Sequence, residues 1–300
     1  MVRRSGRGLT DMLISLLVAI GLLTGFAVGV IFGNAYRREL LIARFRKQLP
    51  FSWLQVARML LPLGGRLGPF GRLAAYHARA TSPGSDQVLW RTPAGDFWGR
   101  PKDDWFLGHQ VREQYVWHLY DQPEIQVRRG DIVVDAGANL GVFTRFALNR
   151  GAELVIAIEP EPVNAACFKH TFADELRAGR VTLLEAALWR TGECLPFRGD
   201  GDAGAVVRGE TGTHTFVRGI SLDHALSEMK IQRIDMIKMD VEGAERQALD
   251  GARRTIATFT PRMAISIEHN LHDDLELSRL VEEINPAYRF TRGSLVLYCY

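Results

Sequence analysis

The sequence predicts an α/β fold with a mainly parallel sheet, and two observations carry this prediction. The β-branched run 131–135 ends in a glycine turn, and an apolar helical pattern begins directly after the turn at Val142. A second apolar strand, 154–158, ends in Glu159, so strand, helix and strand follow one another as in a βαβ unit. Parallel strands joined by a helix are the repeating unit of such sheets.

The rest of the chain extends this alternation. Residues 88–99 predict two short strands around a Pro-Ala-Gly-Asp turn, and residues 104–120 predict an aromatic-rich helix. Its aromatic residues fit a core better than a sugar-binding platform, although His109, Gln110 and Glu113 could contact a substrate. Downstream we expect a helix at 163–176, a strand at 181–186, a strand-rich segment at 195–220, a strand at 234–238, a helix ending at Ala257, and a strand at 263–267.

The glycine turn D-A-G-A-N-L-G at 135–141 indicates a nucleoside cofactor. Gly137 and Gly141 let backbone and ligand come close, and Glu159 stands where a βαβ unit places a carboxylate on a ribose diol. The turn lacks the G-x-G-x-x-G spacing of dinucleotide sites. The acid Asp135, two positions before the first glycine, suits the ammonium end of S-adenosylmethionine, which carries no phosphate. The spacing therefore favours S-adenosylmethionine over NAD, with an ordinary βα turn as the alternative.

Two further groups of polar residues stand at strand ends, where ligands of parallel α/β sheets bind. Asp240 follows one expected strand, and Glu242 and Glu245 stand at the start of the next helix, where the helix dipole alone also favours carboxylates. Another expected strand ends in Glu268 and His269, which adds an imidazole to the same edge. These residues are candidates for the chemistry of the site.

Four segments together resemble a known family. VVDAGANLGVFT, AIEPEPVNAACFKH, IDMIKMDVEGAERQALDGA and AISIEHN resemble, in order and spacing, the FkbM family of S-adenosylmethionine-dependent methyltransferases over residues 86–300. The resemblance implies a Rossmann-like class I methyltransferase fold and O-methylation, often of sugar or polyketide hydroxyls. Asn139, where the wider superfamily more often has glycine, is one of the marks of this family.

The resemblance also implies roles for individual residues. The cofactor is expected to contact the turn and the next two strand ends, namely Asp135, Gly137, Ala138, Asn139, Gly141, Glu159, Pro160, Glu185 and Ala186. Of these, Glu185 and Ala186 would lie on the adenine side, and a plain strand end is the alternative for them.

The sulfonium of the cofactor already carries an activated methyl group. The protein therefore has to align the acceptor oxygen with that methyl group and to remove the proton of the acceptor hydroxyl. We expect Asp240 or His269 as the general base and Glu242 or Glu268 as the group that orients the acceptor hydroxyl. No metal is expected, since no CxxC or HExxH spacing is present. A divalent metal held by Asp240, Glu242 and His269 is the alternative.

The N-terminal region predicts a membrane anchor. Residues 12–33 are uncharged and mostly apolar, and as a helix they would span roughly 33 Å, enough to cross a bilayer. A signal peptide is the alternative, but its apolar region would be shorter and would precede a small-residue cleavage site. Glycines recur at every fourth position on one face of this helix, at Gly21, Gly25, Gly29 and Gly33. This spacing indicates a homodimer contact between two such helices.

Charge divides the chain into a basic and an acidic part. Residues 36–80 carry nine Arg and Lys residues and one acidic residue. Residues 81–300 carry 25 Arg and Lys residues and 32 Asp and Glu residues. The basic part fits an interfacial helix against anionic lipid, or a solvated linker. The acidic part disfavours nucleic-acid binding. Three scattered cysteines fit a reducing compartment. Because S-adenosylmethionine is kept in the cytosol, we expect the catalytic domain to face the cytoplasm.

These observations predict five segments and leave three function classes. The segments are a short tail at 1–11, a transmembrane helix at 12–33, a basic juxtamembrane linker or interfacial helix at 34–85, an N-terminal cap at 86–130 and a methyltransferase domain at 131–300. The favoured class is a membrane-anchored O-methyltransferase acting on a glycan, a lipid-linked sugar or another small hydroxylated acceptor. The alternatives are an NAD-dependent Rossmann oxidoreductase and a catalytically silent methyltransferase-fold binding protein. The sequence does not identify the acceptor, and it does not decide between methylation of oxygen and methylation of nitrogen.

Overall fold

The computed structural model describes residues 87–300, except 93, 116, 200–203, 208–214 and 270–272. These residues belong to one compact unit of the chain, Phe70–Tyr300. The predicted tail, transmembrane helix, glycine-lined dimer face and basic linker all lie outside the described residues. Within the described ranges, no helix combines the length and the apolar character that crossing a bilayer requires.

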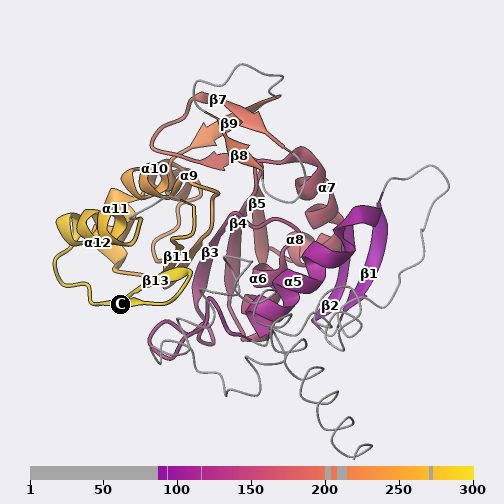
Figure 1. Ribbon diagram of the computed structural model, residues 1–300, viewed down its shortest axis with the longest axis horizontal. Coiled ribbons are helices and arrows are strands. Elements are labelled where there is room, and N and C mark those ends of the chain that lie inside the picture. Colours follow the sequence, from indigo (N-terminus) through magenta and orange to yellow (C-terminus); the bar gives the residue numbers. More distant parts are fainter. Residues whose placement is uncertain (1–86, 93, 116, 200–203, 208–214, 270–272) are drawn as a thin grey trace, which may run out of the picture. The chain divides into compact units, whose positions relative to one another are not determined.

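A seven-stranded sheet forms the centre of this unit (Figure 1). Its spatial order is β12-β13-β11-β10-β3-β4-β5, and only the pairs that involve β13 are antiparallel. The strands are β3 (Ile132–Ala136), β4 (Leu154–Ile158), β5 (Val181–Leu184), β10 (Met236–Met239), β11 (Arg262–Ser266), β12 (Phe290–Arg292) and β13 (Val296–Cys299). The predicted α/β fold with a mainly parallel sheet is confirmed.

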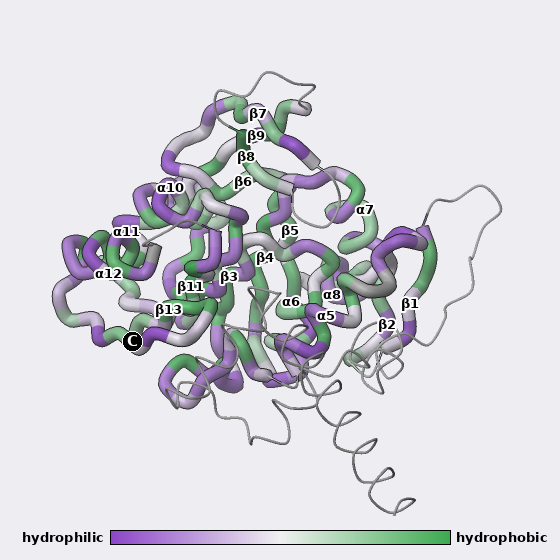
Figure 2. The backbone as a smooth tube through the Cα atoms, viewed as in Figure 1, coloured by the Kyte–Doolittle hydropathy of each residue, from purple (hydrophilic) through white to green (hydrophobic). Residues whose placement is uncertain are grey.

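Helices pack on both faces of this sheet. They are α5 (Asp104–Tyr115), α6 (Val142–Asn149), α7 (Pro162–Thr171), α8 (Ala173–Arg177), α9 (Leu222–Glu228), α10 (Glu245–Asp250), α11 (Arg253–Phe259) and α12 (Asp273–Ile284). The neighbouring residues Val133 and Val134 of β3 belong to different hydrophobic clusters, because successive strand residues point to opposite faces. The first cluster contains residues of α5, α6 and α7, and the second contains residues of α9 to α12. The hydrophobic colouring of the central strands in Figure 2 follows from this two-sided burial.

Two smaller sheets complete the described chain. β1 (Val88–Thr92) and β2 (Gly95–Gly99) form the predicted hairpin. The predicted strand-rich segment contains β7 (Cys194–Arg198), β8 (Ala205–Val206) and β9 (Thr215–Ile220), which join β6 (Ala187–Leu188) in a four-stranded sheet, drawn above the parallel sheet in Figure 1.

Several predicted elements are shorter or divided in the structure. The aromatic helix ends at Tyr115 rather than at 120. The helix predicted at 163–176 is broken at Phe172, whose fully buried ring leaves the backbone outside helical geometry. The helix predicted to end at 257 is divided into α10 and α11 near Gly251, where a Cβ atom would lie 2.0 Å from the Trp189 carbonyl oxygen. Both breaks depend on contacts that are distant in sequence.

Candidate functional site

The turn between β3 and α6 requires glycine at two positions. Gly137 and Gly141 have φ values of 76° and 88°, which side chains with a Cβ rarely adopt. A Cβ on Gly137 would lie 1.7 Å from the Asp240 carbonyl oxygen, and one on Gly141 would lie 2.2 Å from the Phe172 ring. Asn139 also has a positive φ, 50°, which asparagine tolerates. The turn is therefore pressed against the end of β10 and α7.

Glu159 connects the end of β4 to this turn. One of its carboxylate oxygens accepts a hydrogen bond from the Asn139 backbone N–H at 2.8 Å, and the other accepts one from the Glu161 N–H at 2.9 Å. Burial raises the pKa of Glu159 to about 7, although these two hydrogen bonds oppose the change. Each carboxylate oxygen can accept a second hydrogen bond, so Glu159 can still receive the two hydroxyls of a ribose.

Asp135 has internal partners. Its carboxylate is fully buried and accepts a hydrogen bond from the Thr144 hydroxyl at 2.7 Å, while the Lys238 ammonium lies 3.3 Å from its other oxygen. Lys238 also donates to the Gly137 carbonyl oxygen at 2.7 Å. Burial alone would lower the pKa of Lys238, but the charges of Asp135 and Asp240 outweigh it and raise the pKa. The Asp135–Lys238 pair thus stabilises the turn through the Gly137 carbonyl. A ligand that contacted the Asp135 carboxylate would share that carboxylate with Lys238.

Asp240 lies where the turn, β10 and the segment after α5 meet. One of its carboxylate oxygens accepts a hydrogen bond from the Tyr120 hydroxyl at 3.0 Å, and the Lys238 ammonium lies 4.0 Å from the same oxygen. The other oxygen is buried and has no hydrogen-bond partner among the residues that the structure describes. This second oxygen is 3.9 Å from the His269 ring. Asp240 is therefore held by one oxygen, and its second oxygen is a buried acceptor without a hydrogen bond from the described part of the chain.

His269 is surrounded by carboxylates. Its Nε2 lies 3.1 Å from Glu242 and its Nδ1 lies 3.2 Å from Glu245. Burial alone would lower the pKa of His269, but these contacts, with the charge of Asp240, raise it to about 11. The ring is therefore an imidazolium at neutral pH, which favours Asp240 over His269 as a base.

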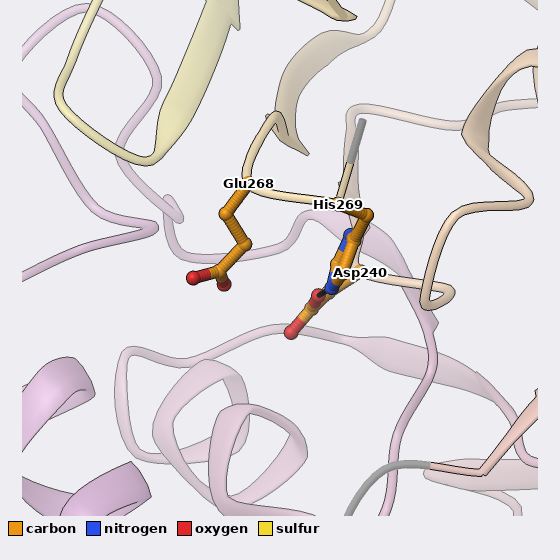
Figure 3. Close-up of side chains that lie close together, drawn as sticks. All are labelled: Asp240, Glu268 and His269. Atoms are coloured by element: carbon orange, nitrogen blue, oxygen red, sulfur yellow. Dashed lines mark ion pairs between the residues drawn. The ribbon is translucent and has the colours of Figure 1, made fainter. Parts of the chain in front are cut away.

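Glu268 stands at the rim of the same group. Asp240, Glu268 and His269 each offer an atom within 4.8 Å of the others. In Figure 3 the side chains of Asp240 and His269 lie together, and the Glu268 side chain stands apart from them. The Glu268 residue is exposed, but its carboxyl end loses water contact to the surrounding protein. This desolvation, followed by the charge of Asp240, raises the pKa of Glu268 to about 7. Glu268 can therefore gain and lose a proton near neutral pH.

The predicted metal alternative can be tested at this cluster. Both ring nitrogens of His269 face carboxylates, an arrangement that holds a proton on each nitrogen rather than a metal ion. We expect methyl transfer to be unchanged after dialysis against EDTA. Incorporation of label from methyl-labelled S-adenosylmethionine into whole-cell extract would measure it. A loss that Mg²⁺ or Mn²⁺ restores would instead support the predicted metal alternative at Asp240, Glu242 and His269.

A narrow cleft lies between α5, the turn and the end of β10. It is lined by residues of α5, Tyr120, the turn, the start of α6, and the end of β10, including Gln110, Glu113, Gln114, Gly137, Ala138, Val142, Phe143, Lys238 and Asp240. Its volume is about 30 Å³, space for roughly two water molecules. The cleft is therefore too small to hold a whole nucleoside.

The structure distributes the predicted residues unevenly. The turn residues, Glu159, Asp240, Glu242, Glu268 and His269 lie at neighbouring strand ends, and Pro160 directly follows Glu159. Glu185 is exposed and forms an ion pair with Lys169 at 2.6 Å. Ala186 is buried against Ile220 and Ala225. His109 pairs with Glu113 at 3.0 Å, and Glu113 lines the cleft.

Sequence reasoning missed Tyr120, Lys238 and Gln114. Tyr120 is one of the aromatic residues that fit a core, and its ring is buried. The sequence therefore gives no sign that its hydroxyl donates a hydrogen bond to Asp240. Lys238 could have been noticed as a lone charge inside an apolar strand, because a buried lysine needs a partner. Gln114 carries no local signal.

Comparison with known proteins gives a family match and a curated relative. A family model described as the methyltransferase FkbM domain matches residues 135–286. The 31-O-demethyl-FK506 methyltransferase FkbM of Streptomyces tacrolimicus is 29% identical over 172 residues, which are 47% of this chain and 66% of that protein. This chain thus spans about two thirds of the length of the curated relative that it matches.

Two solved structures are also similar. The methyltransferase FkbM from Methylobacillus flagellatus KT has 22% sequence identity and a TM-score of 0.46, over 67% of this chain and 56% of that one. The fibrillarin of Aeropyrum pernix, solved with natively bound S-adenosyl-L-methionine, has 9% identity and a TM-score of 0.42, over 76% of this chain and 100% of that one.

Proposed function

Because the chain belongs to the FkbM methyltransferase family and uses S-adenosylmethionine as its cofactor, we propose that it methylates a hydroxyl oxygen of its acceptor. The observation that carries this proposal is the second carboxylate oxygen of Asp240, which lacks a hydrogen bond from the described residues and lies beside the cofactor turn with Glu268 close by. The curated relative is named for a 31-O-demethyl substrate, which also supports an oxygen acceptor. The family match supports methyltransferase activity over the NAD-dependent oxidoreductase and the silent binding protein.

The residues present fit the cofactor. Gly137 and Ala138 of the turn line the cleft, so a cofactor bound there would contact the backbone of the turn. Glu159 would hold the ribose hydroxyls, and the turn 137–141 would contact the nucleoside and methionine parts. The bound cofactor supplies an activated methyl group on sulfur. The protein's remaining task is to hold the acceptor oxygen in line and to remove its proton.

Asp240 and Glu268 divide the proton transfer between them. The second carboxylate oxygen of Asp240 accepts the proton of the acceptor hydroxyl. The acceptor oxygen would take the methyl group from the bound cofactor, whose sulfur would keep the electron pair of the broken carbon–sulfur bond. Tyr120 fixes the orientation of Asp240 through the hydrogen bond to its other oxygen. Glu268, at the rim, takes the proton from Asp240 and releases it to water, which its pKa of about 7 permits. The positive charge of His269 stays between Glu242 and Glu245 and orients both loops.

This division predicts a pH dependence. Because Glu268 must be ionised to take a proton, methyl transfer should rise as the pH increases through about 7. Glu268→Gln should remove this rise and lower the rate above pH 7 on the order of 10-fold. A rate profile between pH 5.5 and 9 measures both. Glu282→Gln, at an exposed position of α12, is the matched control. An unaltered profile in Glu268→Gln would remove Glu268 from the mechanism.

We also propose that the acceptor lies at a membrane and that the domain faces the cytoplasm. The apolar stretch 12–33 and the basic residues of 36–80 support this proposal. Mass spectrometry of membrane glycans and lipids from cells with and without the protein should show species that differ by one methylene unit. A reporter fused at Tyr300 should be inaccessible from outside intact cells. Methylated products found only among soluble compounds, or an external reporter, would contradict the proposal.

A further inference from the structure

Gln114 is a buried amide without a protein partner. The residue is 2% exposed, and both its side-chain oxygen and its side-chain nitrogen lack a hydrogen-bond partner among the residues that the structure describes. Burying an unpaired polar group is costly, and both ends of one amide rarely remain unpaired in a native protein. Gln114 lines the cleft between α5 and the cofactor turn. A ligand in the cleft would therefore find a donor and an acceptor already in place.

The position of Gln114 indicates which part of a ligand it meets. The same cleft is lined by Gly137 and Ala138 of the turn and by Lys238 and Asp240 of the β10 end. Glu159, the ribose candidate, accepts a hydrogen bond from the Asn139 N–H of the turn and is not among the residues that line this cleft. A cofactor whose ribose lay at Glu159 would therefore have its other end near Gln114.

The charges around the cleft fit a zwitterion. Val142 and Phe143, in the first turn of α6, line the cleft, and the N–H groups of a helix start attract a carboxylate. Glu113, on the same side as Gln114, offers a negative charge to an ammonium group. The Gln114 amide, which lines the same cleft, can donate to the carboxylate and accept from the ammonium group.

We propose that Gln114 binds the α-amino acid end of S-adenosylmethionine and selects ligands that carry it. This inference rests on the proposed function, since it needs the cofactor to occupy the cleft. It adds a specificity residue from α5, outside the 135–286 segment that the family model matches.

The test uses ligands with and without the amino acid end. The full-length protein and the Gln114→Leu variant are titrated calorimetrically with S-adenosylmethionine, S-adenosylhomocysteine and 5′-methylthioadenosine, which lacks the amino acid. Gln114→Leu should weaken binding of the first two by about 10- to 100-fold, because each loses hydrogen bonds to charged groups. Binding of 5′-methylthioadenosine should be unchanged.

Stability and a control variant separate binding from folding. Because Gln114 has no hydrogen-bond partner among the described residues, Gln114→Leu should keep or raise the Tm of the ligand-free protein. Gln114→Met, a second apolar residue of similar length, should behave alike. Gln232→Leu, exposed at the opposite end of β10, should bind all three ligands normally. The inference would be overturned if Gln114→Leu weakened the binding of all three ligands equally. It would also be overturned if this variant raised the KM for the acceptor and left the affinity for the cofactor unchanged. A wild-type protein that binds none of them would instead refute the proposed function.

Discussion

The Asp240→Asn variant is expected to transfer methyl groups at least on the order of 10²-fold more slowly than the wild-type protein. Asparagine keeps the shape of the side chain but cannot accept the proton of the acceptor hydroxyl. The hydrogen bond from Tyr120 can persist, since the asparagine oxygen also accepts, so the local structure should change little. Transfer of methyl label from S-adenosylmethionine into membrane extract measures the effect and requires no purified acceptor.

Two controls show whether the loss belongs to the chemistry. Asp174→Asn, at an exposed position of α8, removes a carboxylate far from the cleft and should leave the rate unchanged. The affinity of Asp240→Asn for S-adenosylmethionine should stay within a few-fold of the wild-type value, because the turn and Glu159 are intact. A variant with a normal rate would show that Asp240 is not the base.

The Gly137→Ala variant is expected to lose cofactor binding by roughly 100-fold or more. Its Cβ would lie 1.7 Å from the Asp240 carbonyl oxygen, and its φ of 76° is already unfavourable for alanine. Relief of this clash must separate the turn from the end of β10. That movement breaks the geometry in which Lys238 donates to the Gly137 carbonyl at 2.7 Å.

Gly179→Ala isolates the backbone part of this effect. Gly179 also has a positive φ, 67°, but a Cβ there meets no atom within 4 Å in the described structure. This variant should lower the Tm slightly and bind S-adenosylmethionine normally. Normal cofactor binding by Gly137→Ala would mean that the cofactor does not lie against the turn.

The elements near the turn were predictable because their signals are local. The strand 154–158 has the same bounds in the sequence prediction and in the structure, since a short apolar run ends there at Glu159. The turn was recognisable from glycines that a tight strand-to-helix connection requires. Strand ends then indicated Asp240, Glu268 and His269, because parallel strands bring their carboxyl ends to one edge.

Features that depend on distant contacts were not predictable. The reversed direction of β13 follows from its pairing with β11 and β12, and its apolar run resembles any buried strand. The charge of His269 depends on Glu242 and Glu245, which the fold brings to it from the segment after β10. The unpaired state of Gln114 exists only once α5 packs over the turn.

The central claim is that this chain binds S-adenosylmethionine at the turn between β3 and α6. Calorimetric titration of the full-length protein with S-adenosylmethionine and, separately, with NAD tests it most directly. We predict saturable binding of S-adenosylmethionine that Gly137→Ala abolishes and Gly179→Ala preserves, and no binding of NAD. Binding of NAD, or S-adenosylmethionine binding that is equal in the wild-type protein and in Gly137→Ala, would contradict the claim.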